Sequence, residues 1–180
     1  MIQHFKYILI LLLMVLVGCH TTNKPKELTT PYDSIYIAAD ITWHKQHYSL
    51  LDKNVFSIDL LTDGLSFDSM YNISGTGLNL YISDIFLPLT DSLLHLGTYR
   101  LDTIASSFTI LPYKHFEGGR ITGCYMLDIQ ESTIHRIIGF TSGEMLVNIL
   151  NEGDIRLDFK LYQSDSTCYR ASYQGPALYR

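Results

Sequence analysis

The sequence predicts an all-β domain, built as a single antiparallel β-sandwich or a closed β-barrel of about eight to ten short strands. Apolar and polar residues alternate with a period of two over several segments, as they do in strands with one buried face. Turn-forming residues, mainly Gly, Asp and Pro, separate these segments at short intervals. The chain also contains 13 Tyr and 8 Phe, and aromatic side chains pack well on pleated surfaces.

Four segments show the alternation most clearly. In residues 34–43 the side expected to face the core carries Ile35, Ile37, Ala39, Ile41 and Trp43. In residues 121–129 that side carries Ile121, Gly123, Tyr125, Leu127 and Ile129. Residues 145–149 repeat the pattern, and in residues 154–162 apolar residues alternate strictly with charged ones.

Six further segments are expected to be strands, at residues 55–61, 77–87, 98–102, 107–111, 133–140 and 167–173. The stretch 89–96 is the one with some helical character, and we expect a loop or a single turn there. Short connections favour antiparallel pairing of strands that are neighbours in the sequence.

Residues 1–18 follow a different pattern. Lys6 precedes an apolar run over residues 7–17, which is too short to span a bilayer, since a spanning helix needs about 20 residues. A basic start followed by a short apolar run is typical of a signal peptide. The run ends in Leu16-Val17-Gly18-Cys19, which resembles the lipobox of bacterial lipoproteins.

The lipobox resemblance implies that the thiol of Cys19 takes a diacylglycerol group and that a signal peptidase cuts between Gly18 and Cys19. Two or three acyl chains anchor a protein stably in a membrane. Residues 19–33 are polar and include two prolines, so they are expected to form a flexible tether. Residues 34–180 are then the all-β domain.

Three segments resemble a pattern in small exported lipoproteins of Bacteroidetes-type bacteria, most of unknown function: Gly97-Thr98-Tyr99, Gly139-Phe140-Thr141-Ser142-Gly143 and Tyr173-Gln174-Gly175-Pro176. The resemblance implies a fold and a cell-envelope location but no activity. In such lipoproteins, acidic residues just after the lipidated Cys favour export to the cell surface, and residues 20–24 contain none. The expected location is therefore the outer membrane, facing the periplasm.

Bacteria of this type also O-glycosylate exported proteins at Asp-Ser or Asp-Thr followed by an apolar residue or Thr. Five positions match, with acceptors at Ser34, Ser69, Ser92, Thr103 and Ser166. The alternative is turn chemistry, because an Asp side chain can accept hydrogen bonds from the backbone that follows it.

The composition argues against several function classes. The formal net charge is −5 and there is no basic patch, which disfavours nucleic acid as a partner. The sequence has no Gly-x-Ser-x-Gly motif, no Gly-rich phosphate loop and no His-Glu-x-x-His motif. We therefore expect no cofactor, and an enzyme is not the first hypothesis.

The segment after the first strand is the main candidate for a ligand or metal site. It contains Trp43, His44 and His47, and a turn between the two His could bring their rings onto one metal ion. A third ligand would then come from another His, with His95, His115 and His135 available. The alternatives are solvent-exposed loop histidines and an ordinary core Trp, which could otherwise be a platform for a sugar ring.

Two further residue sets have alternative interpretations. Cys124 and Cys168 could form a disulfide in an oxidising periplasm or remain separate buried thiols. Four tyrosines fall on strand faces that we expect to be outward or that are ambiguous: Tyr36, Tyr81, Tyr162 and Tyr169. Amphipathic Tyr on a β surface suits binding to glycans or proteins and also suits a plain cross-strand ladder.

The leading functional hypothesis is a lipid-anchored, non-enzymatic envelope protein that binds a protein or glycan partner through one face or one end. The first alternative is a lipocalin-like carrier, which requires a barrel whose interior is not filled by side chains. The second is a metal-dependent or other hydrolase, which requires His44, His47 and a further His or Asp to converge in a concave site.

Overall fold

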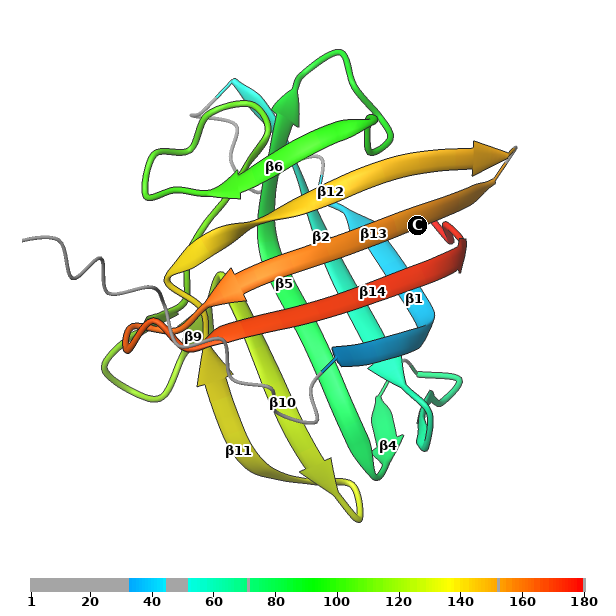
Figure 1. The fold of residues 1–180 in the computed structure, drawn as a ribbon, viewed down its shortest axis with the longest axis vertical. Coiled ribbons are helices and arrows are strands. Elements are labelled where there is room, and N and C mark those ends of the chain that lie inside the picture. The colour runs from blue at the N-terminus through cyan, green and yellow to red at the C-terminus, as the bar shows by residue number, and fades with distance from the viewer. Residues whose placement is uncertain (1–32, 45–51, 71, 152, 180) are drawn as a thin grey trace, which may run out of the picture.

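The strands close into a barrel, which is one of the two predicted architectures (Figure 1). The structure is a computed structural model and describes residues 33–44, 52–70, 72–151 and 153–179. Its strands are β1 (Asp33–Trp43), β2 (Lys53–Thr62), β3 (Leu65–Phe67), β4 (Ile73–Gly75), β5 (Gly77–Pro88), β6 (Gly97–Leu101), β7 (Thr109–Ile110), β8 (Lys114–His115), β9 (Ile121–Thr122), β10 (Cys124–Gln130), β11 (Thr133–Gly139), β12 (Ser142–Asn151), β13 (Asp154–Tyr162) and β14 (Cys168–Pro176).

Strand β5 closes the barrel because one of its edges is shared by two partners. Its first half pairs with β10, from Gly77 to Ile82, and Ile85 and Phe86 pair with β7. The ring then runs β5, β7, β6, β12, β13, β14, β1 and β2 back to β5. The hairpin β10–β11 extends the sheet beyond the barrel wall (Figure 1). Residues 89–96 form a loop, as expected.

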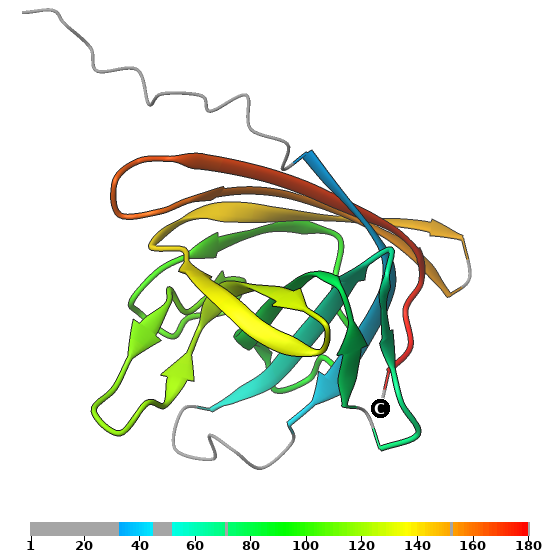
Figure 2. The same ribbon diagram turned by 90° about the horizontal axis from the view of Figure 1, so that it is seen from below.

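Inward-facing side chains form one continuous core across the barrel. In Figure 2 the sheet of β12, β13 and β14 lies opposite β1, β2 and β5. Their buried residues belong to a single cluster, which includes Phe56, Leu80, Met145, Leu157 and Phe140. Eight-stranded barrels have an interior just wide enough to be filled in this way. Among the described residues, no helix is long and apolar enough to cross a membrane.

The face predicted for β1 is correct only in its second half. Ala39 and Ile41 are buried, but Ile35 and Ile37 are 72% and 58% exposed, while Tyr36 is only 1% exposed. The pairing with β2 shifts register between Tyr36 and Ala38. A β-bulge of this kind inserts one residue and so moves the following side chains to the opposite face.

The predicted strand 121–129 is interrupted at Gly123, which separates β9 from β10. Gly123 has a φ of 83°, and a Cβ there would overlap the carbonyl oxygen of Pro112. In β10 the residues that join the barrel core are Cys124 and Met126, which the alternation had assigned to the other face. The predicted face is wrong because both faces of β10 are covered by other parts of the protein. Apolar residues therefore occur on both faces and do not mark the one that points into the barrel.

Two of the tyrosines predicted to be outward or ambiguous are in the core. Tyr36 and Tyr169 are 1% and 4% exposed, and their hydroxyl groups are hydrogen-bonded to each other. Tyr81 and Tyr162 are half-buried. A tyrosine with an internal hydrogen-bond partner can replace an apolar core residue, and the alternation of the sequence does not reveal such a partner.

Candidate functional site

The outer face of β1, β2, β5 and β10 carries a row of polar and aromatic residues that cross-strand pairing places side by side. Asp40 pairs with Asp59, Asp59 with Tyr81, and Tyr81 with Tyr125. Paired residues on adjacent strands have Cβ atoms about 4.5–5.5 Å apart. Their neighbours along the strands, such as Leu80 and Ile82, face the core, so the row lies outside the barrel.

A cleft of about 320 Å³ opens beside this row and is called the outer cleft here. It is lined by His44, Val55, Tyr81, Ser83, Asp84, Arg120, Ile121, Thr122 and Tyr125. The strands β2, β5 and β10 supply the floor, and the segment from Arg120 to Thr122 supplies one wall. The volume is at the lower end of the range of about 300–1,000 Å³ that is usual for small-ligand sites.

A β-bulge brings two polar side chains of β5 to the outer cleft. The pairing of β2 with β5 shifts register between Phe56 and Ile58, so that β5 has extra chain at Ser83 and Asp84. The Ser83 hydroxyl donates to the Asp84 carboxylate and accepts the Gly123 N–H at 2.6 Å. Bulges commonly re-aim side chains beside functional sites.

His44, a predicted site residue, does line the outer cleft. Its backbone N–H donates to the Val55 carbonyl at 2.8 Å, and its Nε2 atom lies 2.9 Å from the Ser57 Oγ atom. Ser57 also hydrogen-bonds Tyr81. A continuous hydrogen-bond chain therefore runs from the imidazole of His44 to the phenol of Tyr81 and fixes both side chains.

The two tyrosines of the outer cleft are held as neutral phenols. Burial raises the pKa of Tyr81, and the neighbouring Asp59 carboxylate raises it further, although the Ser57 hydrogen bond acts in the opposite direction. Burial also raises the pKa of Tyr125, helped by Tyr81 and Asp59. The two rings lie 5.2 Å apart, centroid to centroid, so the cleft has a rigid aromatic floor with hydroxyl groups.

The other predicted metal ligands are not brought together. His95 lies in the β5–β6 loop, 3.4 Å from Asp91, whereas His115 is on β8 and His135 is on β11. His47 and the side chain of Trp43 lie outside the described part of the structure. In that part, no group of three His, Cys, Asp or Glu residues could hold a metal ion.

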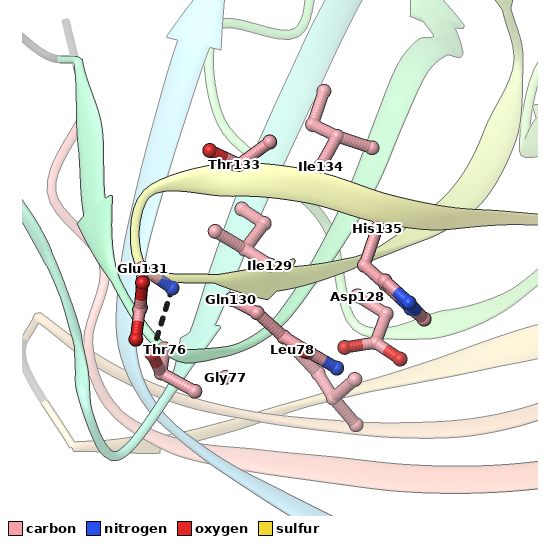
Figure 3. A pocket seen from close by; sticks show the side chains of 10 residues that line it. All are labelled: Thr76, Gly77, Leu78, Asp128, Ile129, Gln130, Glu131, Thr133, Ile134 and His135. Atoms are coloured by element: carbon pink, nitrogen blue, oxygen red, sulfur yellow. Dashed lines mark hydrogen bonds between the residues drawn. The ribbon is translucent and has the colours of Figure 1, made fainter.

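A second hollow, the hairpin groove, lies beside the turn of β10–β11 (Figure 3). Its volume is about 800 Å³, and its lining includes Leu78, Asp128, Glu131, Ile134 and His135. Figure 3 shows Asp128 and His135 on the same side of the hairpin. The groove is larger than the outer cleft but more exposed, and its wall strand β11 is exposed from Thr133 to Ile137.

Cys124 and Cys168 are buried free thiols, so the disulfide alternative is not what the structure shows. Cys124 is on β10 and Cys168 is on β14, with β5, β2 and β1 between them in the sheet. Burial raises the pKa of Cys124, which keeps its thiol protonated and unreactive.

Four of the five predicted glycan acceptors, Ser69, Ser92, Thr103 and Ser166, are exposed in loops. Ser34 is different, because it is 9% exposed and its Oγ atom accepts a hydrogen bond from Tyr169.

The Asp residues before three of these acceptors show the turn chemistry of the alternative interpretation. Asp68, Asp102 and Asp165 each accept a hydrogen bond from the backbone N–H two residues later. These contacts do not exclude a glycan on the neighbouring hydroxyl.

Asp84, Arg120 and Tyr125 are among the lining residues of the outer cleft that the sequence analysis does not identify as site residues. The position of Asp84 in the cleft depends on a bulge, and that of Arg120 depends on the packing of a loop. Neither feature can be recognised from a local sequence pattern. No protein-family model matches the chain, and searches of curated proteins and of solved structures returned no match.

Proposed function

We propose that this protein is a lipid-anchored envelope module that binds a glycan in the outer cleft. The observation that carries the proposal is that one concave surface is lined by two tyrosine rings, a carboxylate, an imidazole and a guanidinium group. Carboxylate and Arg groups form the stronger, charge-assisted hydrogen bonds with hydroxyl groups, and aromatic faces pack against the apolar face of a sugar.

The size and rigidity of the outer cleft support a small ligand or the end of a longer one. Tyr81 and His44 are fixed through Ser57, so little side-chain freedom would be lost on binding, which favours affinity. A mixed set of donors and acceptors suits a ligand with many hydroxyl groups better than a purely apolar one.

Titration calorimetry against a panel of disaccharides tests the glycan proposal. Maltose, cellobiose, lactose and chitobiose differ in linkage and in their substituents. We expect at least one to bind, and Arg120→Ala to weaken that binding by roughly 10- to 150-fold, since a hydrogen bond to a charged group contributes ~1.5–3 kcal/mol. Lys114→Ala is the matched control, because Lys114 is an exposed cation that does not line the cleft.

Binding of no saccharide, or equal affinity in the Arg120→Ala protein, contradicts the proposal. The anchor has a separate test, because it concerns Cys19. A radiolabelled fatty acid should be incorporated into the chain in its own bacterium and should be absent from a Cys19→Ser variant. If the Cys19→Ser variant also incorporated the label, the lipid would be attached to another residue.

The carrier is the second candidate, because a closed eight-stranded barrel is an architecture that carries small ligands. The filled core argues for the outer surface over the interior as the binding place. Native mass spectrometry of protein extracted from its own membrane separates the two candidates. A retained non-covalent apolar molecule would favour the carrier, and its absence would favour the outer cleft.

A further inference from the structure

We propose that the outer face of β6, β12, β13 and β14 is the side that rests against an anionic membrane surface, with lipid phosphate groups as its ligands. This inference rests on the proposed lipid anchor, and it adds which side of the barrel meets the membrane. The face is called the basic face below and is defined by the exposed residues Arg100, Arg156, Lys160 and Arg170.

Cross-strand pairing gathers the basic face into a row. Arg100 pairs with Glu144, Glu144 with Lys160, and Lys160 with Arg170. Three cations therefore follow one another across four strands with a single carboxylate among them. Side chains paired in this way project on the same side of the sheet, so the charges point outward together.

The charge of the basic face contrasts with the rest of the molecule. Half of the basic side chains that the structure describes lie on it, although the chain as a whole is acidic, with a net charge of −5. Its acidic residues are Glu144, Asp154 and Asp158, with Asp33 paired to Arg170 at its edge, and Asp158 is held by Arg156 at 2.9 Å. The row of Arg100, Lys160 and Arg170 is therefore the part of this face that an anionic surface would attract.

The path of the chain points to the same side. Asp33, the first described residue, pairs with Arg170 at the end of the basic row. Residues 20–32 connect Cys19 to this point and can span at most about 45 Å when fully extended. A lipid on Cys19 would thus keep the barrel close to the bilayer, with its tether attached at the basic face.

The surface around Arg170 offers a cation and a hydroxyl group to a lipid phosphate, beside the carboxylate of Asp158. A groove of about 350 Å³ is lined by Ser34, Ile35, Asp158, Arg170 and Ser172, among others. Arg is well suited to phosphate oxygens, and Ser172 offers a hydroxyl group. Ile35 and Leu146, which are 72% and 40% exposed, place apolar side chains on the same face, where they could contact the headgroup region.

Thiol labelling of the lipidated full chain in nanodiscs tests this orientation. The two native thiols of the barrel are buried, so a water-soluble maleimide reports on one introduced cysteine. Gln174→Cys lies on the basic face and Glu117→Cys lies on the β8–β9 hairpin, and both positions are exposed. We expect labelling at position 174 to be about fivefold slower in phosphatidylglycerol-containing nanodiscs than in phosphatidylcholine nanodiscs, and unchanged at position 117.

Charge variants make the test specific. Replacing Arg100, Lys160 and Arg170 together with Ser should abolish the slowing, and so should high salt, because the attraction is screened. Replacing Lys53, Lys114 and Arg136 with Ser removes the same charge elsewhere and should preserve the slowing. Equal rates in the two lipids, or slowing at position 117 instead, would overturn the proposal.

The anchor and the orientation fail in different ways. If Cys19 carries no lipid, the chain will not co-purify with phosphatidylcholine nanodiscs, which offer no anionic surface. If the anchor is present but the basic face does not dock, the chain will co-purify and label at equal rates in both lipids.

Discussion

The hydroxyl groups of Tyr36 and Tyr169 lie 3.1 Å apart inside the barrel, and they join the first strand to the last. Tyr169 also donates to the Ser34 Oγ atom at 2.9 Å, and Tyr36 contacts the Met126 sulfur at 3.8 Å. The strands β1 and β14 are paired in parallel at this point. A buried polar chain therefore secures the seam where the two ends of the barrel meet.

Removing one hydroxyl from this seam should destabilise the barrel. Tyr169→Phe leaves the polar groups of Tyr36 and Ser34 with fewer buried partners, at a cost of about 1–3 kcal/mol. Urea unfolding followed by circular dichroism measures the change. Tyr162→Phe is the control, because Tyr162 is half-buried, and it should change stability by less than about 0.5 kcal/mol. Equal effects of the two substitutions would contradict a special role for the seam.

Alkaline conditions should unfold the protein through its buried phenols. Burial raises the pKa of Tyr99 to about 12, against an opposing effect of its hydrogen bond to His95, and burial raises that of Tyr36 well above its usual value. Both values exceed the value of about 10 in an unfolded chain. The stability from the neutral phenols is therefore complete below about pH 10 and is lost as the pH rises toward 12.

Urea unfolding at pH 8, 10 and 11 measures this dependence. The free energy of unfolding should be nearly constant up to pH 10 and then fall, with a smaller fall in a Tyr99→Phe variant. A free energy that declines equally in both proteins would point to other groups.

A side chain at Gly143 should cost more than one at Gly153. Both glycines have positive φ, at 133° and 87°, which costs other residues roughly 1–2 kcal/mol. A Cβ at Gly143 would also overlap the carbonyl oxygen of Lys160 on β13, whereas a Cβ at Gly153 meets nothing within 4 Å. Gly143→Ala should therefore lower stability by a further 1–3 kcal/mol or so. Thermal unfolding of both variants measures the difference, and equal melting temperatures would falsify the steric argument.

The thiols of Cys124 and Cys168 should resist modification in the folded state. Both are buried, and burial raises the pKa of Cys124. In buffer, protein isolated from oxidising conditions should not react with a thiol reagent. After unfolding in guanidinium, the thiols of Cys124 and Cys168 should both react. If the protein's mass were lower by two hydrogens than that of the dithiol form, and no thiol reacted after unfolding, the two cysteines would instead be joined in a disulfide.

Glycosylation of the predicted acceptors should follow their exposure. Peptide mapping by mass spectrometry should find glycan on Ser69, Ser92, Thr103 or Ser166, which are exposed, and none on Ser34, whose hydroxyl is buried against Tyr169. Glycan on Ser34 alone would require modification before folding.

The outer cleft was predictable only in part. His44 was identified because two His close in sequence after a strand attract attention, and the structure does place it in a cleft. The described His residues form no metal-binding group with other His, Cys, Asp or Glu residues of the described part, and His47 lies outside that part. The cleft is instead completed by Asp84 and Arg120, which are distant from His44 in sequence and carry no motif.

The sequence by itself determined where the long strands are, because period-two alternation reports directly on a half-buried strand, whereas the short strands β3, β4 and β8 were not predicted. The clearest case is residues 154–162, which match β13 residue for residue. The tertiary structure decided how the strands close and which faces point inward. Closure depends on two strands sharing one edge of β5, and the faces of β1 and β5 depend on bulges. A bulge arises where two paired strands, distant in sequence, contribute unequal numbers of residues. The sequence of either strand by itself therefore does not predict it.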